Sequence, residues 1–325
     1  MSSISGARLH FLRLILWSSV MSSSRTDLGE DKICLCVDCG ENLERTAAAF
    51  TCMGCERSYR QDSFGVWDFR VRAGPAGAPK IFEEAEFHRW LKIFNEQESK
   101  AWVIYKNALF RFFAQSGHRI LGKSITKNRA PEDYVLEIGA GTGALLNFTP
   151  DKNFVAVDMS LESLRGLKSK FPRVTCIYAS ASALPFNSGA FQHVVSLHTL
   201  EHLYFLAEAL QEMRRVMHER GTLYYAIPTE GGAAFALGRK FITGPHLRKK
   251  YNLDVQYVMD REHINDAPRV LKFLRMHYDG VTRRYWPLPF LRLLSLNALI
   301  FGEGKIRARG RVKRAGVKRD GAAND

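Results

Sequence analysis

Long hydrophobic runs are missing from this sequence of 325 residues. Although 46% of the residues are hydrophobic, no apolar stretch approaches the roughly 20 residues that a membrane-spanning helix requires. Internal repeats are also missing, which argues against solenoid and propeller architectures. These two absences leave a globular protein with one large domain or two modest ones.

Acidic residues are absent from residues 1–26, which contain three arginines and eight serines. This composition is typical of an organelle transit peptide, whereas Arg13 interrupts the apolar run that a secretory signal would need. An alternative is that translation begins at Met21. We therefore expect residues 1–30 to be a disordered or transit-like extension. We expect a cytoplasmic protein, unless this extension directs import into an organelle.

Acids are also absent from residues 305–319, which hold eight of the 47 lysines and arginines. The net charge of +14 favours an anionic partner such as nucleic acid, phosphate or a membrane surface. Because much of that charge lies in one Gly/Ala-rich stretch, we expect residues 304–325 to be a disordered basic tail. We therefore expect a small molecule as the partner, and nucleic acid is the alternative.

Cysteine is uncommon, but four of the six cysteines are regularly spaced in the pattern C-x2-C-x12-C-x2-C. Each pair places two thiolates on one tight turn, and two such pairs complete a tetrahedral zinc site. The alternatives are two disulfides or unrelated buried thiols. The sequence thus predicts a zinc ribbon over residues 31–71, in a reducing compartment. The predicted ligands of its structural Zn²⁺ are Cys36, Cys39, Cys52 and Cys55.

Three stretches connect this ribbon to the rest of the chain. Residues 64–69, FGVWDF, are β-prone and are expected to end the ribbon. A linker rich in glycine, proline and alanine follows over 72–80. Apolar residues then recur at helical spacing, so residues 81–130 are expected to form a helical cap.

A glycine-rich turn follows a buried strand in YVLEIGAGTGALL, residues 134–146. The apolar run ends in GAGTG, Gly139–Gly143, and an apolar helix pattern follows. Glycines in such a turn let the backbone approach a ligand closely. Asp158 lies at the end of a second apolar run, where an acidic residue is placed to accept hydrogen bonds from ribose hydroxyls.

Further apolar runs alternate with helical patterns. Residues 174–186 and 193–203 each combine a strand with a loop, and 206–228 is predicted as a helix, a turn at Gly221 and a fifth strand. Strands that alternate with helices indicate an α/β fold with a doubly wound parallel sheet. Such sheets bind ligands at the carboxyl ends of their strands.

Residues 131–228 resemble the methyltransferase type 11 group of the class I S-adenosylmethionine-dependent methyltransferases. The resemblance lies in the ordered motifs VLEIGAGTG, VDMS, ALPFNSGAFQHVVSLHTLEHL and EALQEMRRVMHERGTLYYAIP. It implies a Rossmann-like, mostly parallel, seven-stranded sheet in a domain at 131–303, which ends in an antiparallel hairpin of residues 280–287 and 296–303. It also implies S-adenosylmethionine (SAM) as the cofactor.

The same resemblance assigns residues to the cofactor. The three loop glycines cradle the methionine part, Glu137 organises their loop, Asp158 holds the ribose hydroxyls and Met159 packs against adenine. Ser180 stands where the family usually has an aspartate, so its hydrogen bond to the adenine amino group would be weaker. The implied cofactor-binding residues are Glu137, Gly139, Gly141, Gly143, Asp158, Met159, Ser180 and Ala181.

Residues 198–202 form the pattern H-x-x-E-H, which inverted zinc metalloproteases carry. A protease would need this pattern on a helix with a third ligand, without a SAM-binding fold around it. Short patterns also match by chance. We therefore expect Glu201 and His202 to be structural, and His198 to contact the cofactor or the substrate. The alternative is a divalent cation, which some ubiquinone-pathway O-methyltransferases hold with an E-x-x-E-H pattern at this place. The chain resembles that pattern only in part, because His198 replaces the first glutamate.

The segment 229–266 is expected to be an irregular, substrate-binding insertion. It has no acid between Glu230 and Asp254, so its basic residues suit a phosphorylated or carboxylated substrate or else form a solvated face. His263 is expected at a helix start, where the positive end of the dipole would keep it a neutral base. The catalytic candidates are therefore His263 first and His198 second.

The predicted reaction is transfer of a methyl group from SAM to an acceptor. The chain lacks an N/D-P-P-Y motif, which argues against methylation of an adenine or glutamine amino group. O-methylation of a small-molecule or sugar-containing substrate, anionic if the basic insertion binds it, is the first interpretation. The alternatives are base methylation of rRNA or tRNA and a non-catalytic SAM-binding adaptor. Nothing in the sequence indicates the oligomeric state.

Overall fold

The computed structural model describes residues 30–71, 89, 93, 108–229, 232–238, 240–241, 244–290, 297 and 299–306. The transit-like extension before Glu30, the linker at 72–80, most of the helical cap before Ala108 and the basic tail after Ile306 lie outside the described residues. Within the described ranges, no helix is both long and apolar enough to span a membrane.

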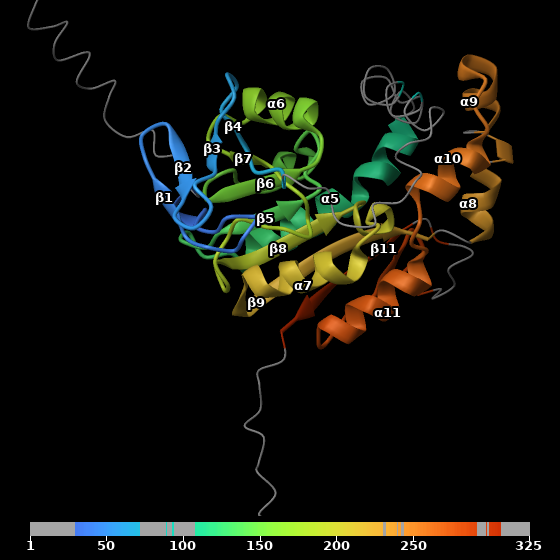
Figure 1. The fold of residues 1–325 in the computed structure, drawn as a ribbon. Coiled ribbons are helices and arrows are strands. Elements are labelled where there is room, and N and C mark those ends of the chain that lie inside the picture. The colour runs from blue at the N-terminus through green and yellow to red at the C-terminus, as the bar shows by residue number, and fades with distance from the viewer. Residues whose placement is uncertain are drawn as a thin grey trace, which may run out of the picture.

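The fold is built on one sheet of eight strands in the order β10-β11-β9-β8-β5-β6-β7-β4 (Figure 1). Neighbours from β9 to β4 are parallel, and β11 is antiparallel to both β9 and β10. The mostly parallel sheet and its final antiparallel hairpin are therefore confirmed. The strands are β4 (Val66–Asp68), β5 (Val135–Ile138), β6 (Phe154–Asp158), β7 (Thr175–Tyr178), β8 (Phe191–Leu197), β9 (Met217–Pro228), β10 (Arg284–Trp286) and β11 (Leu299–Lys305).

Helices cover both faces of this sheet (Figure 1). α5 (Ala108–Asn128) and α6 (Leu161–Lys170) contribute to one hydrophobic layer, and α7 (Leu206–Val216) and α11 (Ala267–His277) to the other. Alternate residues of β5 serve the two layers, with Val135 in the first and Leu136 in the second. Burial on both faces explains why the central strands are continuous apolar runs in the sequence.

The N-terminal segment, residues 30–71, supplies the eighth strand. It begins with a short 3-10 helix, η1 (Glu30–Lys32), and forms a three-stranded antiparallel sheet from β1 (Leu43–Arg45), β2 (Ala49–Cys52) and β3 (Ser58–Arg60). β4 follows this small sheet in the chain but belongs to the large one, where it pairs in parallel with β7 and places Trp67 opposite Ile177. The expectation that FGVWDF ends the ribbon is therefore wrong, because its strand belongs to the large sheet. The expected number of seven strands is also wrong, because this strand is the eighth. A strand at the edge of a sheet leaves backbone groups unpaired, and β4 covers those of β7.

The N-terminal segment is joined to the large domain at three further places. The backbone N–H groups of Cys34 and Leu35 both donate to the carbonyl oxygen of Pro185, at 2.9 and 3.2 Å. Arg165 of α6 lies 2.7 Å from Asp62. Trp67 and other apolar residues of the segment belong to the same hydrophobic cluster as β5 and α7. The segment is therefore part of the domain core and not an appended module.

Two predicted elements differ from the structure near the centre of the sheet. The helix expected after the glycine turn is a single 3-10 turn, η4 (Ala144–Asn147). β9 already begins at Met217, so the predicted turn at Gly221 is absent from this described stretch. The pairing of β8 with β9 shifts register between Phe191 and His193, which accommodates the additional residues inside the strand.

The insertion after β9 is helical rather than irregular. Its described parts form α8 (Ala233–Gly238), α9 (Gly244–Tyr251) and α10 (Val255–Glu262). The side chain of Asp254 accepts a hydrogen bond from the backbone N–H of Gln256 and caps α10. Asp266 caps α11 in the same way through the N–H of Arg269. Aspartates at helix starts therefore divide this stretch into short helices.

The glycine loop, Gly139–Gly143, connects β5 to η4. Its three glycines have positive φ angles of 73°, 51° and 79°. At Gly139 a Cβ atom would lie 2.1 Å from Oγ1 and 2.8 Å from Cβ of Thr199, which follows β8. The loop therefore needs glycine at this position both for its backbone conformation and for contact with the neighbouring strand end.

Replacement of Trp67 tests whether β4 belongs to the domain core. Trp67 is 4% exposed, its ring centroid lies 4.7 Å from that of Phe50, and its Nε1 donates to Glu30 at 2.8 Å. We expect Trp67→Ala to lower the free energy of unfolding of the whole domain by about 3–5 kcal/mol in one transition. Urea unfolding followed by circular dichroism measures this. The control is Met53→Ala at an exposed position, and a separate early transition in Trp67→Ala would show an independent module.

A glycine pair tests the packing of the glycine loop against Thr199. Gly189 has φ 75°, close to that of Gly139, but a Cβ there would meet nothing within 4 Å. Gly189→Ala should therefore cost only the left-handed backbone strain, about 1–2 kcal/mol. Gly139→Ala should cost a further 1–3 kcal/mol, roughly, because Thr199 must move. Equal losses of unfolding free energy in the two variants would contradict the tight contact.

Candidate functional site

Four neighbouring strands end at the same edge of the sheet and bring the predicted site residues together. The glycine loop follows β5, Asp158 ends β6, Ser180 follows β7 and His198 follows β8. Parallel pairing places the carboxyl ends of these strands side by side, with Ile138 opposite both Val157 and Ser196. Residues separated by up to 60 positions in the sequence thus form one candidate active site.

Asp158 holds the glycine loop to the end of β6. One carboxylate oxygen accepts a hydrogen bond from the backbone N–H of Gly141 at 2.7 Å, and the other accepts from that of Ser160 at 2.7 Å. Burial raises the pKa of Asp158 above its usual value, although these backbone donors act to lower it. The carboxylate is therefore fixed in place beside the loop, with remaining acceptor capacity for a ligand.

Glu137 is a second buried carboxyl group at this edge. It is 2% exposed, and among the described residues its Oε2 has no hydrogen-bond partner. Burial, and next the charge of Asp158, raise the pKa of Glu137 well above its usual value. A buried carboxyl oxygen without a donor is costly, so this position suits a ligand that donates a hydrogen bond.

The predicted adenine side of the site has both an exposed apolar residue and a hydroxyl. Met159 is 59% exposed, which is unusual for a large apolar side chain next to a buried strand. The hydroxyl of Ser180 lies 2.8 Å from that of Ser182 and accepts from the N–H of Ser182 at 3.3 Å. Ala181 is buried beside them. These residues, with Glu137, Asp158 and the glycines, fit a cofactor that has an amino group, a ribose and an aromatic base.

Four histidines form a cluster at the end of β8, which we call the histidine cluster: His118, His198, His202 and His263. The rings of His118 and His198 stack with their centroids 5.6 Å apart, and those of His202 and His263 meet edge-on at 4.5 Å. Glu201 lies between the two pairs, with Oε1 4.0 Å from Nδ1 of His198 and 3.9 Å from Nε2 of His202.

Burial lowers the pKa of three histidines of this cluster, His198, His202 and His263. It lowers the pKa of His198 to about 3, with further lowering from His118 and His202. Burial also lowers the pKa of His263 to about 3, again helped by its histidine neighbours. For Glu201, burial raises the pKa to about 8. Near neutral pH the imidazoles of His198 and His263 are therefore neutral and can accept hydrogen bonds.

The H-x-x-E-H pattern does not lie on an α-helix. His198 has a positive φ of 54°, and only Leu200–His202 form a single 3-10 turn, η5. His198 and His202 are therefore not spaced one turn apart on a common α-helical face, as the metalloprotease arrangement requires. Strained backbone at a non-glycine residue is a feature of functional positions.

The predicted position of His263 at a helix start is wrong. His263 is the C-terminal cap of α10, and its backbone N–H donates to Met259 at 2.8 Å. The helix dipole is negative at that end, so burial, not the dipole, lowers the pKa of His263. Asn265 does not cap α11, which begins after Asp266. It is buried, and its side chain donates to the carbonyl oxygens of Leu200 and Leu203.

Sequence patterns did not identify three residues of this site. His118 comes from α5, where the predicted helical periodicity suggested only packing. Thr199 lies against Gly139, and Glu262 ends α10 beside His202. No local motif marks them, because their contacts are with segments far away in the chain. Only related sequences in which these positions vary together would have indicated the pairing.

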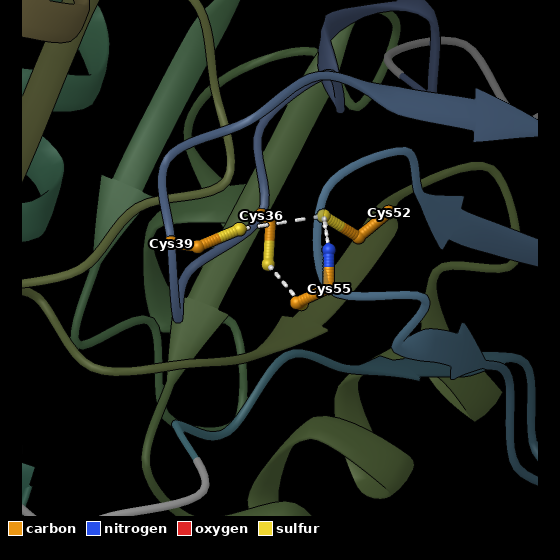
Figure 2. A group of neighbouring side chains, drawn as sticks. All are labelled: Cys36, Cys39, Cys52 and Cys55. Atoms are coloured by element: carbon orange, nitrogen blue, oxygen red, sulfur yellow. Dashed lines mark hydrogen bonds between the residues drawn. The ribbon is translucent and has the colours of Figure 1, made fainter.

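The four regularly spaced cysteines also come together (Figure 2). Their sulfur atoms lie within 4.8 Å of one another, with 3.7 Å between Cys36 and Cys55 and 3.4 Å between Cys39 and Cys52. All six cysteines lie in the described ranges, and none forms a disulfide. The backbone N–H groups of Gly54 and Cys55 point at the sulfur of Cys52. This cysteine cluster could therefore hold a metal ion.

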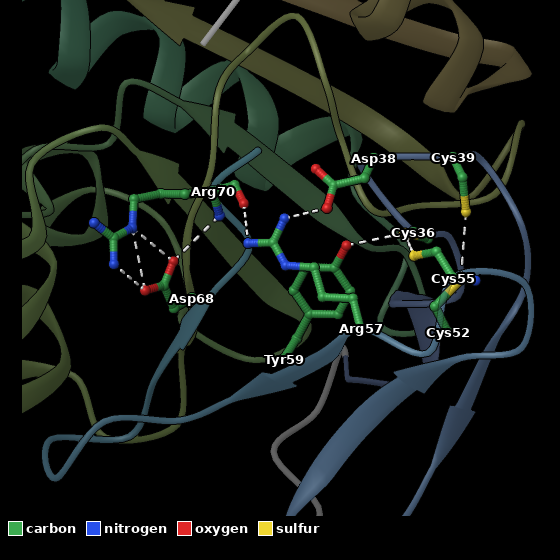
Figure 3. A network of polar contacts seen from close by, with 9 residues as sticks. All are labelled: Cys36, Asp38, Cys39, Cys52, Cys55, Arg57, Tyr59, Asp68 and Arg70. Atoms are coloured by element: carbon green, nitrogen blue, oxygen red, sulfur yellow. Dashed lines mark hydrogen bonds and ion pairs between the residues drawn. The ribbon is translucent and has the colours of Figure 1, made fainter. Parts of the chain in front are cut away.

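A polar network links the cysteine cluster to β4 (Figure 3). The hydroxyl of Tyr59 lies 3.0 Å from the sulfur of Cys36. Arg57 lies over the ring of Tyr59 and donates to Asp38 and to the carbonyl oxygen of Arg70. Arg70 in turn forms an ion pair with Asp68 of β4. The cysteine turns and the edge of the large sheet are thus connected by continuous contacts.

Among solved structures, 1,6-didemethyltoxoflavin-N1-methyltransferase of Burkholderia thailandensis is 13% identical, with a TM-score of 0.46. The match covers 80% of this chain and 99% of that one.

Sequence comparison gives relatives that match the same central part of the chain. An uncharacterized protein of Methanocaldococcus jannaschii is 38% identical over 93 residues, which are 29% of this chain and 40% of that protein. A probable S-adenosylmethionine-dependent methyltransferase of Mycobacterium tuberculosis is 27% identical over 139 residues, which are 42% of this chain and 50% of that protein. The chain thus spans half or less of the length of these curated relatives. Residues 136–225 match the family described as a methyltransferase domain, and this is the part of the chain whose motifs predicted such a domain.

Proposed function

We propose that the chain is a SAM-dependent methyltransferase that methylates a hydroxyl group of a small-molecule or sugar-containing acceptor. The observation that carries this proposal is the common edge of four parallel strands. There the glycine loop, the buried carboxyl groups of Glu137 and Asp158, and the histidine cluster meet. The family of residues 136–225 and the related methyltransferases support the same reaction class.

The cofactor half of the site is formed by residues on β5, β6 and β7. Asp158 would accept hydrogen bonds from the ribose hydroxyls, and the unpartnered oxygen of Glu137 would accept one from the methionine part. Met159 and Ala181 would pack on the adenine, whose amino group Ser180 would hold. When bound, SAM supplies an electrophilic methyl group on a sulfonium centre. The protein's contribution is to orient the acceptor and to exclude water.

The acceptor half of the site is the histidine cluster. A hydroxyl acceptor loses its proton as it is methylated, and a neutral imidazole can take that proton. We assign this role to His198, because it directly follows β8 and among the described residues its buried Nε2 has no hydrogen-bond partner. His263 was the first candidate in the sequence, but it lies at the end of α10 and packs against His202.

The basic end of α9, a helix that packs against α10, favours an acceptor with an anionic group. α9 ends in Arg248, Lys249 and Lys250, all of which are exposed. The neighbouring Leu247 and Tyr251 are buried and hold the helix against the domain. A phosphate or carboxylate on the acceptor would be attracted to this basic face.

The cysteine cluster would hold one structural Zn²⁺. With zinc–sulfur bonds of about 2.3 Å, a tetrahedral site places its sulfur atoms about 3.8 Å apart. The distances of 3.7 and 3.4 Å between cysteine pairs are close to that value, whereas a disulfide requires about 2.05 Å. Thiolate ligands of this kind are stable in a reducing compartment such as the cytoplasm.

The cofactor assignment predicts different effects for residues at the two ends of β6. Asp158→Ala should lower the affinity for SAM roughly ten- to a hundredfold, because a charge-assisted hydrogen bond contributes about 1.5–3 kcal/mol. Asp151→Ala, just before the other end of β6, should leave the affinity unchanged. His198→Gln should bind SAM normally and lower kcat for the acceptor. Calorimetry measures the affinities, and formation of S-adenosylhomocysteine measures turnover.

Several outcomes would contradict this proposal. Equal SAM affinities of Asp158→Ala and the unchanged protein would show that the site is misassigned. Product formation only with RNA, together with salt-sensitive binding, would replace the small-molecule acceptor by rRNA or tRNA. SAM binding without turnover on either acceptor class would indicate a non-catalytic adaptor.

The zinc assignment predicts a coupling between the metal and the whole domain. The purified chain should contain one zinc, and Cys52→Ser should lose it. Because the N-terminal segment shares its core and a strand with the large sheet, this loss should lower the unfolding temperature of the whole domain. Cys34→Ser, outside the cluster, should retain the zinc and the unfolding temperature. Metal analysis and calorimetry measure both, and zinc-free protein of unchanged stability would refute the assignment.

A further inference from the structure

Glu201 is buried beside the histidine cluster with an incomplete set of partners. It is 2% exposed, and among the described residues its Oε2 has no hydrogen-bond partner. Its other oxygen, Oε1, lies 4.0 Å from Nδ1 of His198 and 3.9 Å from Nε2 of His202. Among the described residues, these are the only ion pairs of Glu201. A buried carboxyl oxygen without a hydrogen-bond donor is costly, and a ligand that contacts it offsets that cost. The position therefore points to a ligand.

Three side chains that can bind a metal converge next to Glu201. One ligand atom each of His202, Glu262 and His263 lies within 4.8 Å of the other two. They come from two segments, η5 and the end of α10, and all three are half-buried. We propose that His202, Glu262 and His263 bind one divalent transition-metal ion beside the buried carboxyl group of Glu201.

The orientation of His202 fits the role of a ligand. Its Nδ1 lies 2.7 Å from the carbonyl oxygen of Glu262, so Nδ1 carries the hydrogen and donates it. The lone pair of the ring is then on Nε2, the nitrogen that lies 3.9 Å from Glu201. Histidines that bind metals commonly donate their other N–H to a carbonyl oxygen in this way. Here that carbonyl belongs to Glu262, itself a proposed ligand.

The two segments that carry the ligands are fixed to each other by hydrogen bonds. The backbone N–H of Asn265 donates to the carbonyl oxygen of Glu201 at 3.1 Å. Its side chain donates to Leu200 and Leu203 at 3.1 and 2.7 Å. The hydroxyl of Tyr204 donates to the carbonyl oxygen of Arg261 at 2.9 Å. The ligands are therefore held near one another by the fold, which lowers the cost of ordering them around an ion.

The donor set determines the class of ion and its use. Two imidazole nitrogens and one carboxylate suit zinc, manganese or iron, and three protein ligands leave coordination positions open. A divalent ion at such a position lowers the pKa of a hydroxyl group that it binds. If the chain is the O-methyltransferase proposed above, the acceptor is a compound whose reactive hydroxyl ionises on the ion. Binding of the ion itself does not depend on that function.

Cobalt(II) titration of the full chain tests the site. We expect one Co²⁺ per chain beyond any ion in the cysteine cluster, with d–d absorption but without the thiolate-to-cobalt charge-transfer bands that cysteine ligands produce. Glu262→Gln and His263→Asn should each weaken this binding at least roughly tenfold, as loss of even a supporting contact does. His218→Ala, at the opposite end of β9, should leave it unchanged.

Each outcome decides for or against the proposal. Absence of cobalt uptake beyond a thiolate-bound ion would overturn it, and so would uptake that neither Glu262→Gln nor His263→Asn weakens. SAM calorimetry on the same samples separates this inference from the proposed function. If the chain binds SAM but takes up no Co²⁺ beyond the cysteine cluster, only the proposed metal site is refuted. If it takes up that Co²⁺ but does not bind SAM, only the proposed methyltransferase function is refuted.

Discussion

Parallel pairing of β8, β5, β6 and β7 is the interaction on which the candidate site depends. The ladder aligns the carboxyl ends of these strands, and the loops that follow them meet at one edge. Helices cover both faces of the sheet, so most side chains within the central strands are apolar. Chemistry is therefore confined to the edge, where each strand contributes a short polar or glycine-rich sequence.

The candidate site contains two buried carboxyl groups that lack part of their hydrogen bonding among the described residues. Glu137 and Glu201 are each 2% exposed, and each has an oxygen without a hydrogen-bond partner among the described residues. Burial raises the pKa of both. Such groups reduce the stability of the ligand-free domain and contribute to binding energy when a donor or cation arrives. One lies beside the glycine loop and the other beside the histidine cluster, so they mark two separate parts of the same edge.

The N-terminal segment extends the same sheet rather than forming a separate module. β4 covers the free edge of β7, and Cys34 and Leu35 bond to Pro185 in the loop that also carries Ser180. The polar network of Arg57, Asp38 and Tyr59 continues this connection to the cysteine cluster. The cysteine turns and the edge that carries the glycine loop are thus connected through one continuous set of contacts.

The sequence by itself determined the elements whose signal is local. The apolar runs, the glycine loop, Asp158 and the two C-x2-C pairs predicted the parallel sheet, its binding edge and the cysteine cluster, because each requires particular residues at short spacing. Tertiary structure alone decided that β4 joins β7, that His118 stacks on His198, and that His263 ends α10 and faces His202. These contacts join residues that are 61 to 110 positions apart in the sequence. No pattern of neighbouring residues encodes them, since they follow from how the helices and the sheet pack around a shared core.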